Sequence, residues 1–77
     1  MKKLAILGTG CAKCVQLAHN AEEAAKAAGV AYELEKVTDI NQILSYGVMT
    51  TPALVIDGKV ASMGKVLPVD DIKKMLS

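Results

Sequence analysis

Both cysteines of the chain, Cys11 and Cys14, stand two residues apart in the stretch LGTGCAKC. Two thiols at this spacing have three possible uses. They exchange electrons as a dithiol and a disulfide, bind a soft metal ion, or are simply two small buried side chains. Because a helical pattern begins at the pair and the chain has no other cysteine, we favour a chemical use.

The position of Cys11 favours the thiolate form. A glycine-flanked turn places it at the N-cap or in the first turn of a helix, where unsatisfied N–H groups and the helix dipole converge. Cysteines in such places commonly have a pKa of roughly 3.5–7.5 instead of about 8.5. Gly10 leaves the approach to Cys11 open, and Lys13 adds positive charge if its side chain points toward the pair.

Cys14 lies one helical turn further on, on the apolar side of the predicted helix. Its thiol should therefore be more buried and less acidic than that of Cys11. This asymmetry suits thiol–disulfide exchange, in which Cys11 attacks and Cys14 resolves the mixed disulfide by attacking the sulfur of Cys11. One helical turn also brings two Cα atoms within the range that a disulfide tolerates.

The hydrophobic pattern predicts the elements that position these thiols, in the order strand, helix, strand, helix, strand, strand, helix. Gly29 is suited to end the first helix, and Thr38 or Asp39 to cap the second. Asp57-Gly58 is a strong hairpin signal, and Pro68 fits the first turn of the last helix. The expected ranges are strand 3–7, a helix from the cysteine pair to 28, strand 30–37 near the sheet edge, a short helix ended by Gly47, strand 53–56, strand 59–63 and a helix from 68 onward.

Apolar residues in the two shorter helices indicate which faces they bury. We expect Ile40, Ile43 and Leu44 to face inward from the second helix. The last helix should bury the stripe Val69, Ile72, Met75 and Leu76.

The fold class that follows is α/β, with one domain over residues 1–77. The first two strands are joined through a helix and should be parallel by a right-handed crossover. The last two form a hairpin. We expect a four-stranded mixed sheet, with the strand before the cysteines central and three helices on its two faces.

A second signal is Thr51-Pro52, directly before an apolar strand. Proline cannot donate to a strand ladder and therefore belongs at a strand start. Together with the Cys-x-x-Cys pair in this element order, it resembles the thioredoxin/glutaredoxin superfamily. The whole chain is similar to small archaeal and bacterial redox-active disulfide proteins, through GTGCxxC, the alanine-rich helix, Thr51-Pro52, Asp57-Gly58 and a lysine-rich last helix.

The resemblance implies a minimal thioredoxin-like fold and roles for particular residues. Cys11 would be the nucleophile and Cys14 the resolving thiol. Pro52 would be cis and lie beside the active-site disulfide, and Thr51 would offer backbone hydrogen bonds to the bound partner. Ala12-Lys13 stands where thioredoxins typically have Gly-Pro. Beyond the redox-active disulfide itself no cofactor is implied, and the partners would be protein disulfides or dithiols and a reductase.

The alternative function is a soft-metal-binding or metal-chaperone module that uses the same two thiols. Small metal chaperones also carry an early Cys-x-x-Cys, but they end on a strand, whereas this chain is expected to end in a helix. A zinc site needs about four ligands, and His19 falls on the polar side of its helix. We therefore predict no metal site.

Composition and the lengths of the apolar runs argue against a nucleic-acid-binding, membrane-spanning or secreted protein. Nine basic residues against eight acidic ones give no basic face for nucleic acid, and no segment approaches the roughly 20 apolar residues of a membrane helix. The apolar run after Met1 is too short for a signal peptide. We expect a monomer in the cytoplasm, where a Cys-x-x-Cys pair is more often catalytic or metal-binding than structural.

Overall fold

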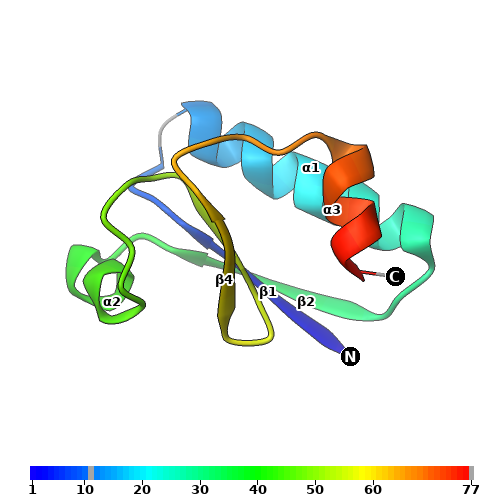
Figure 1. The fold of residues 1–77 in the computed structure, drawn as a ribbon, viewed down its shortest axis with the longest axis horizontal. Coiled ribbons are helices and arrows are strands. Elements are labelled where there is room, and N and C mark those ends of the chain that lie inside the picture. The colour runs from blue at the N-terminus through cyan, green and yellow to red at the C-terminus, as the bar shows by residue number, and fades with distance from the viewer. Residues whose placement is uncertain (11, 77) are drawn as a thin grey trace.

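The seven elements follow one another in the order that the sequence predicts. The computed structural model describes residues 1–10 and 12–76. Its elements are β1 (Lys2–Leu7), α1 (Ala12–Ala28), β2 (Tyr32–Val37), α2 (Ile40–Ser45), β3 (Ala53–Ile56), β4 (Lys59–Met63) and α3 (Val69–Leu76) (Figure 1). The predicted α/β fold is confirmed.

The four strands form one mixed sheet in the order β2-β1-β3-β4. β1 is parallel to β2, with Leu7 opposite Val37, and antiparallel to β3, with Leu7 also opposite Ala53. β1 is therefore an inner strand and β2 an edge strand, as predicted. Because the cysteine stretch follows β1, the chain leaves the middle of the sheet where it enters α1.

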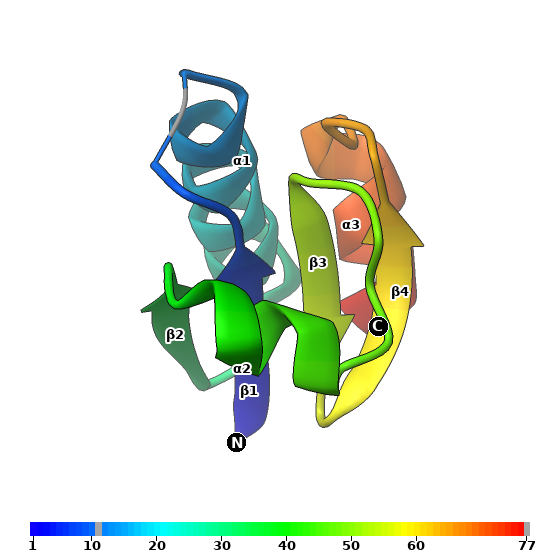
Figure 2. The ribbon, with the colours of Figure 1, turned by 90° about the vertical axis from the view of Figure 1, so that its left-hand side faces the viewer.

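Helices cover both faces of the sheet, with α1 and α3 on one face and α2 on the other (Figure 2). The larger core joins Leu4 and Ile6 of β1 to the buried side of α1 and to Ile72 of α3. Alanines form much of that side of α1, and their small size lets the helix lie close to the sheet and to α3. The smaller core, under α2, comprises Ala5, Leu7, Val37, Ile43, Val48, Ala53 and Val55.

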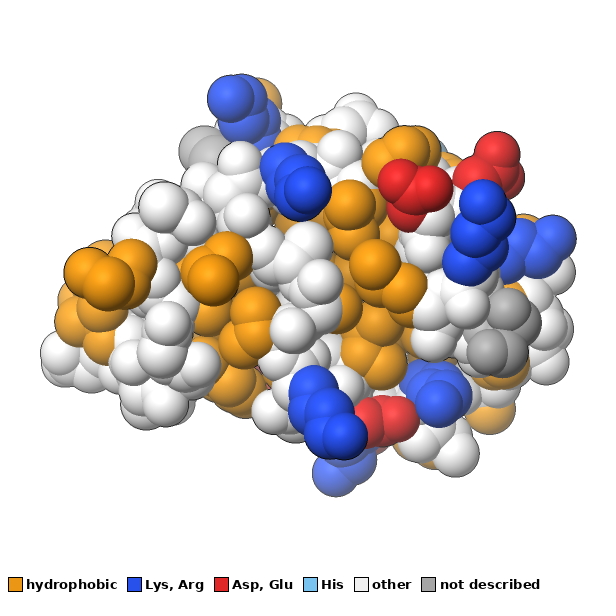
Figure 3. All heavy atoms as spheres, viewed as in Figure 1, with side chains coloured by type: hydrophobic (Ala, Val, Ile, Leu, Met, Phe, Trp, Pro, Cys, Tyr) orange, Lys and Arg blue, Asp and Glu red, His pale blue; other side chains and the backbone are white. Residues whose placement is uncertain are grey.

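Three details of the helices differ from the expectation. Ile40 and Leu44 are 57% and 56% exposed, because the six-residue α2 reaches the sheet mainly through Ile43. Hydrophobic side chains are visible on the surface over α2 and in a band between β4 and α3 (Figure 3). Met75 is 43% exposed. Pro68 lies just before α3, where its carbonyl accepts the N–H groups of Asp71 and Ile72.

Asn20 of α1 ties this helix to the segment before α3. Its Nδ2 donates to the carbonyl of Leu67 at 2.9 Å in a partly buried place, and its Oδ1 accepts from Gln16 at the surface. Replacing Asn20 with alanine should lower the free energy of unfolding by about 1 kcal/mol, because a partly buried carbonyl loses its donor. Thermal unfolding should show a Tm lower by about 4–8 °C.

Gln16→Ala is the matched control for Asn20→Ala. It removes only the exposed hydrogen bond and should change stability by less than about 0.5 kcal/mol. Equal effects of the two substitutions would contradict a special role for the bond to Leu67.

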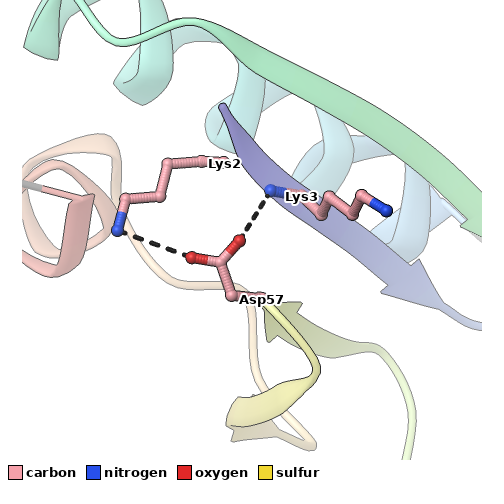
Figure 4. A network of polar contacts seen from close by, with 3 residues as sticks. All are labelled: Lys2, Lys3 and Asp57. Carbon is pink, nitrogen blue, oxygen red and sulfur yellow. Dashed lines mark hydrogen bonds and ion pairs between the residues drawn. The ribbon is translucent and has the colours of Figure 1, made fainter.

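The turn between β3 and β4 is also tied to β1. Asp57 and Gly58 have φ angles of 50° and 82°, the left-handed pair of a tight hairpin turn. Asp57 Oδ1 accepts the N–H of Lys3 at 2.9 Å, and Oδ2 lies 3.5 Å from Lys2 Nζ (Figure 4). The backbone hydrogen bond from Lys3, helped by the charge of Lys2, lowers the pKa of Asp57 below its ordinary value.

This lowered pKa predicts a pH dependence of stability. Because the folded-state pKa lies below the unfolded value of about 3.9, the contribution of Asp57 is present above that value and is lost as the pH falls through the folded-state pKa. Asp57→Asn keeps an acceptor oxygen and tolerates positive φ. Denaturant unfolding from pH 7 to pH 2 should therefore show a smaller acid loss for Asp57→Asn than for the parent, and parallel curves would contradict this.

Candidate active site

The candidate site lies where the chain leaves the carboxyl end of β1. Gly8, the residue after β1, donates its N–H to the carbonyl of Val37 at 3.0 Å. Pro52 directly precedes β3, whose Ala53 is opposite Leu7. The sheet therefore brings Gly8 and Thr51-Pro52 side by side, although more than forty residues separate them in sequence. The Thr51–Pro52 peptide bond is cis.

Cys14 lies in the first turns of α1 and is buried, with 5% of its surface exposed. A Cβ atom built on Gly8 would overlap Cys14 Sγ, and it would lie 3.3 Å from Cys14 Cβ and 3.9 Å from Thr51 Cβ. Gly8 thus lies between the Cys14 thiol and Thr51, where the sulfur atom leaves room only for a residue without a side chain. Cys11, predicted as the nucleophile, lies outside the described residues.

The loop that carries Thr51-Pro52 is held by the segment that follows the neighbouring strand β4. Gly64, after β4, donates its N–H to the carbonyl of Pro52 at 2.9 Å, and a Cβ on Gly64 would lie 2.9 Å from Thr50 Oγ1. Pro52 is fully buried, whereas Thr51 is exposed. This loop is therefore fixed in place and presents Thr51 at the surface beside Cys14.

Gly10 and Lys13 are both exposed and flank the position of Cys11 in the chain. Gly10 has a φ of 90°, so its backbone conformation suits glycine. It also lines a small hollow that borders Cys14. Both residues thus lie at the surface near the predicted site.

Three residues of this region are not predicted as site residues from the sequence. The hollow that borders Cys14 is also lined by Lys36 and Thr38, from the end of β2, and by Val15 of α1. The signal that would have found them is the parallel crossover itself, because it brings the end of β2 next to the end of β1.

The described residues contain no cluster of three His, Cys, Asp or Glu side chains that could hold a metal ion. His19 is exposed, as expected for the polar side of α1. Among the helices of residues 1–10 and 12–76, none has the length and apolar character to cross a membrane.

Comparisons with known proteins agree with this geometry. A family profile described as "Thioredoxin domain" matches residues 2–77. A protein of Methanothermobacter thermautotrophicus named thioredoxin is 46% identical over 77 residues, which cover all of both chains. Another of that name, from Methanocaldococcus jannaschii, is 38% identical over 76 residues, covering 99% of this chain and 87% of the relative. The chain therefore belongs to the thioredoxin domain family.

Proposed function

We propose that this protein is a thiol–disulfide oxidoreductase that uses Cys11 and Cys14 as its redox-active pair. The observation that carries the proposal is the placement of Cys14, buried in the first turns of α1 against Gly8 and next to Thr51-Pro52. A thiol buried there is shielded from outside disulfides and is suited to react only with a mixed disulfide formed at Cys11. Membership of the thioredoxin domain family supports the same chemistry.

The proposed exchange has two displacement steps. In the first, the Cys11 thiolate attacks one sulfur of a protein disulfide, a mixed disulfide forms, and the other substrate sulfur leaves as a thiolate that takes a proton from water. In the second, Cys14 loses its proton to water and its thiolate attacks Cys11 Sγ. The second substrate sulfur leaves, two electrons have passed to the substrate, and the protein holds a Cys11–Cys14 disulfide.

The residues around the cysteine pair bind the substrate and favour the reactive thiolate in this mechanism. Thr51 and Pro52 form the substrate-side wall, where the backbone of Thr51 offers hydrogen bonds to an extended partner segment. Gly10 keeps the approach to Cys11 open, and Lys13 favours its thiolate. The partners are protein disulfides or dithiols and a dithiol reductase that regenerates the pair by the reverse steps. We place the activity in a monomer in the cytoplasm, with no further cofactor.

Intact-mass spectrometry across defined dithiol/disulfide buffers tests this function. We expect a reversible loss of two hydrogens, with a midpoint near the cytosolic range of about −220 to −320 mV. The protein should be purified without chelator, so that any bound metal is retained. A chain that carries a metal ion and resists oxidation until the metal is removed would refute the redox function in favour of metal binding.

A further inference from the structure

The outer side of β2 is not paired with any strand of residues 1–10 and 12–76, because β2 is the first strand in the sheet order β2-β1-β3-β4 (Figure 2). On its inner side, the carbonyl of Val37 accepts the N–H of Gly8, which follows β1. Successive residues of a strand direct their backbone groups to alternate sides, so Tyr32, Leu34 and Lys36 direct theirs away from the sheet. This row of N–H and C=O groups is suited to pair with a further strand.

The edge formed by β2 is regular, whereas the opposite edge of the sheet, formed by β4, is not. Every residue of β2 pairs in register with a residue of β1. In β4 the register shifts between Leu54 and Val55 of its partner strand, so that Val60 and Ser62 are opposite adjacent residues. A bulge of this kind twists an edge and hinders pairing with another strand. Of the two edges, β2 is therefore the one suited to bind an extended segment.

The side chains of β2 differ in character between the two faces of the sheet. Tyr32 and Leu34 are half-buried and pack against the larger core, on the face covered by α1. Glu35 is opposite Ala5, which belongs to the smaller core under α2. Because alternate residues share a face, Glu33 and Glu35 both lie on the α2 face, and both are exposed. The edge thus presents apolar groups on one face and two carboxylates on the other.

A hollow of about 300 Å³ adjoins the two carboxylates on the α2 face. Glu33, Glu35 and Tyr46 line it, together with Lys3 and Val55. Within the described part of the chain neither glutamate forms an ion pair, and Lys3 offsets only one of their two charges. Carboxylates bind a guanidinium group through two parallel hydrogen bonds, and an aromatic ring attracts the same cation. The hollow therefore suits the head of an arginine side chain.

We propose that the outer edge of β2 binds an extended segment of a partner protein in which basic residues alternate with apolar ones. The backbone of this segment pairs with the outward groups of β2 and adds a strand to the sheet. Its basic side chains lie beside Glu33 and Glu35, and an arginine among them enters the hollow beside Tyr46. Its apolar side chains cover Tyr32 and Leu34 on the other face. The site uses neither thiol, so it is a function beyond disulfide exchange.

A second copy of this chain fits the same edge poorly. When two β2 strands pair antiparallel about a two-fold axis, residues of the same face lie opposite one another. In the registers with the greatest overlap, centred on Glu33, Leu34 or Glu35, a glutamate is opposite a glutamate. Like charges at such positions destabilise strand pairing. The two glutamates therefore oppose self-association and favour a basic partner.

An NMR titration of the reduced protein with a capped peptide of alternating arginine and valine tests the proposal. Chemical-shift changes should concentrate on the amides of β2. The double variant Glu33→Gln, Glu35→Gln should bind the peptide about fivefold more weakly, because two cross-strand charge pairs are lost. Equal affinity of the parent and this variant would refute recognition by charge. No binding to the parent would show that the glutamates only keep other strands away from the edge, which also overturns the proposal.

The double variant Asp70→Asn, Asp71→Asn is the control for loss of two negative charges. Both aspartates are exposed in the first turn of α3, on the face of the sheet opposite the hollow. This variant should bind the peptide as the parent does, and weakening equal to that of the glutamate variant would refute a local site. A peptide of four arginines followed by four valines has the same composition without the alternation. It should lose the shifts on β2, and if it keeps them the paired-strand geometry is wrong.

Amide hydrogen exchange tests the strand pairing itself. In the free protein the outward amides of Tyr32, Leu34 and Lys36 should exchange faster than those of Glu33 and Glu35, which face β1. At a peptide concentration ten times the measured Kd, exchange of the three outward amides should slow about tenfold, in proportion to the unbound fraction. Slow exchange without peptide would show that a second copy already covers the edge, and unchanged exchange with peptide would place binding elsewhere. Either result overturns the proposal, and neither depends on the thiol chemistry.

Discussion

Replacing Cys14 with serine should convert the protein from a catalyst of exchange into a trap that stays covalently joined to its partner. Attack by Cys11 does not need Cys14, so the first displacement proceeds and the mixed disulfide forms. No second thiol is then available to release it. Non-reducing electrophoresis and intact mass should show about one partner per chain, and dithiothreitol should release it.

Cys11→Ser is the complementary variant and should form no mixed disulfide at all. A serine hydroxyl is not ionised at neutral pH and does not attack a disulfide, so turnover should fall to the uncatalysed background. The pair of variants distinguishes the attacking thiol from the resolving one. Exchange of their behaviours would reverse the assigned roles, and parent-like turnover by Cys14→Ser would refute the two-thiol mechanism.

The burial of Cys14 requires a second variant at that position. Serine places a hydroxyl in surroundings where only 5% of the residue is exposed, which costs about 1–3 kcal/mol if the hydroxyl finds no partner. Cys14→Ala removes the thiol without adding a polar group. Both variants should trap the partner equally well, because trapping depends on the missing thiol and not on stability.

The order and pairing of the elements could be predicted because each has a strong local signal. Gly29 ends α1 with a φ of 70°, and Asp57-Gly58 forms the tight turn between β3 and β4. Asp39 caps α2 by accepting the N–H of Asn41 at 2.9 Å. These residues act within a few positions of themselves, so the chain alone reveals them.

Side-chain burial on the short helix α2 was predicted less well. Ile40, Ile43 and Leu44 follow a helical spacing, yet only Ile43 is buried. Whether an apolar side chain is covered depends on the length and tilt of the helix over the sheet, which no local pattern specifies. Ile40 and Leu44 are thus exposed because α2 is too short to cover the smaller core completely.

The candidate site was also predicted only in part, because some of its residues have a local sequence signal and others are brought to it only by the tertiary fold. Cys14 and Thr51-Pro52 carry recognisable chemistry, and their proximity follows from the pairing of β1 with β3. Lys36 has no distinguishing neighbours in sequence, and it reaches the hollow of Cys14 only because β2 runs parallel to β1. In the sequence, Gly8 belongs to the glycine-flanked turn before the cysteines, whereas the structure shows that it also makes room for a sulfur atom.

Gly8→Ala should therefore have the largest effect of any single methyl group added near the site. The new Cβ would overlap Cys14 Sγ, so the thiol or the start of α1 must move. Overpacking of this kind costs about 1–3 kcal/mol, which corresponds to a Tm lower by roughly 5–20 °C in a chain of this length. Because Cys14 is displaced, release of the mixed disulfide should slow more than its formation, and the intermediate should accumulate during turnover.

Gly29→Ala separates this packing effect from the general cost of replacing a glycine. Gly29 has a φ of 70°, and a Cβ there would meet no atom within 4 Å, so alanine costs only backbone strain, about 1 kcal/mol. It lies at the other end of α1 from Cys14 and should lower stability without changing the ratio of the two exchange steps. Only Gly8→Ala should change that ratio, since its methyl group alone competes with the resolving sulfur for space. A Gly8→Ala protein that is as stable as the parent and releases its partner as fast would show that the sulfur of Cys14 has another place to go.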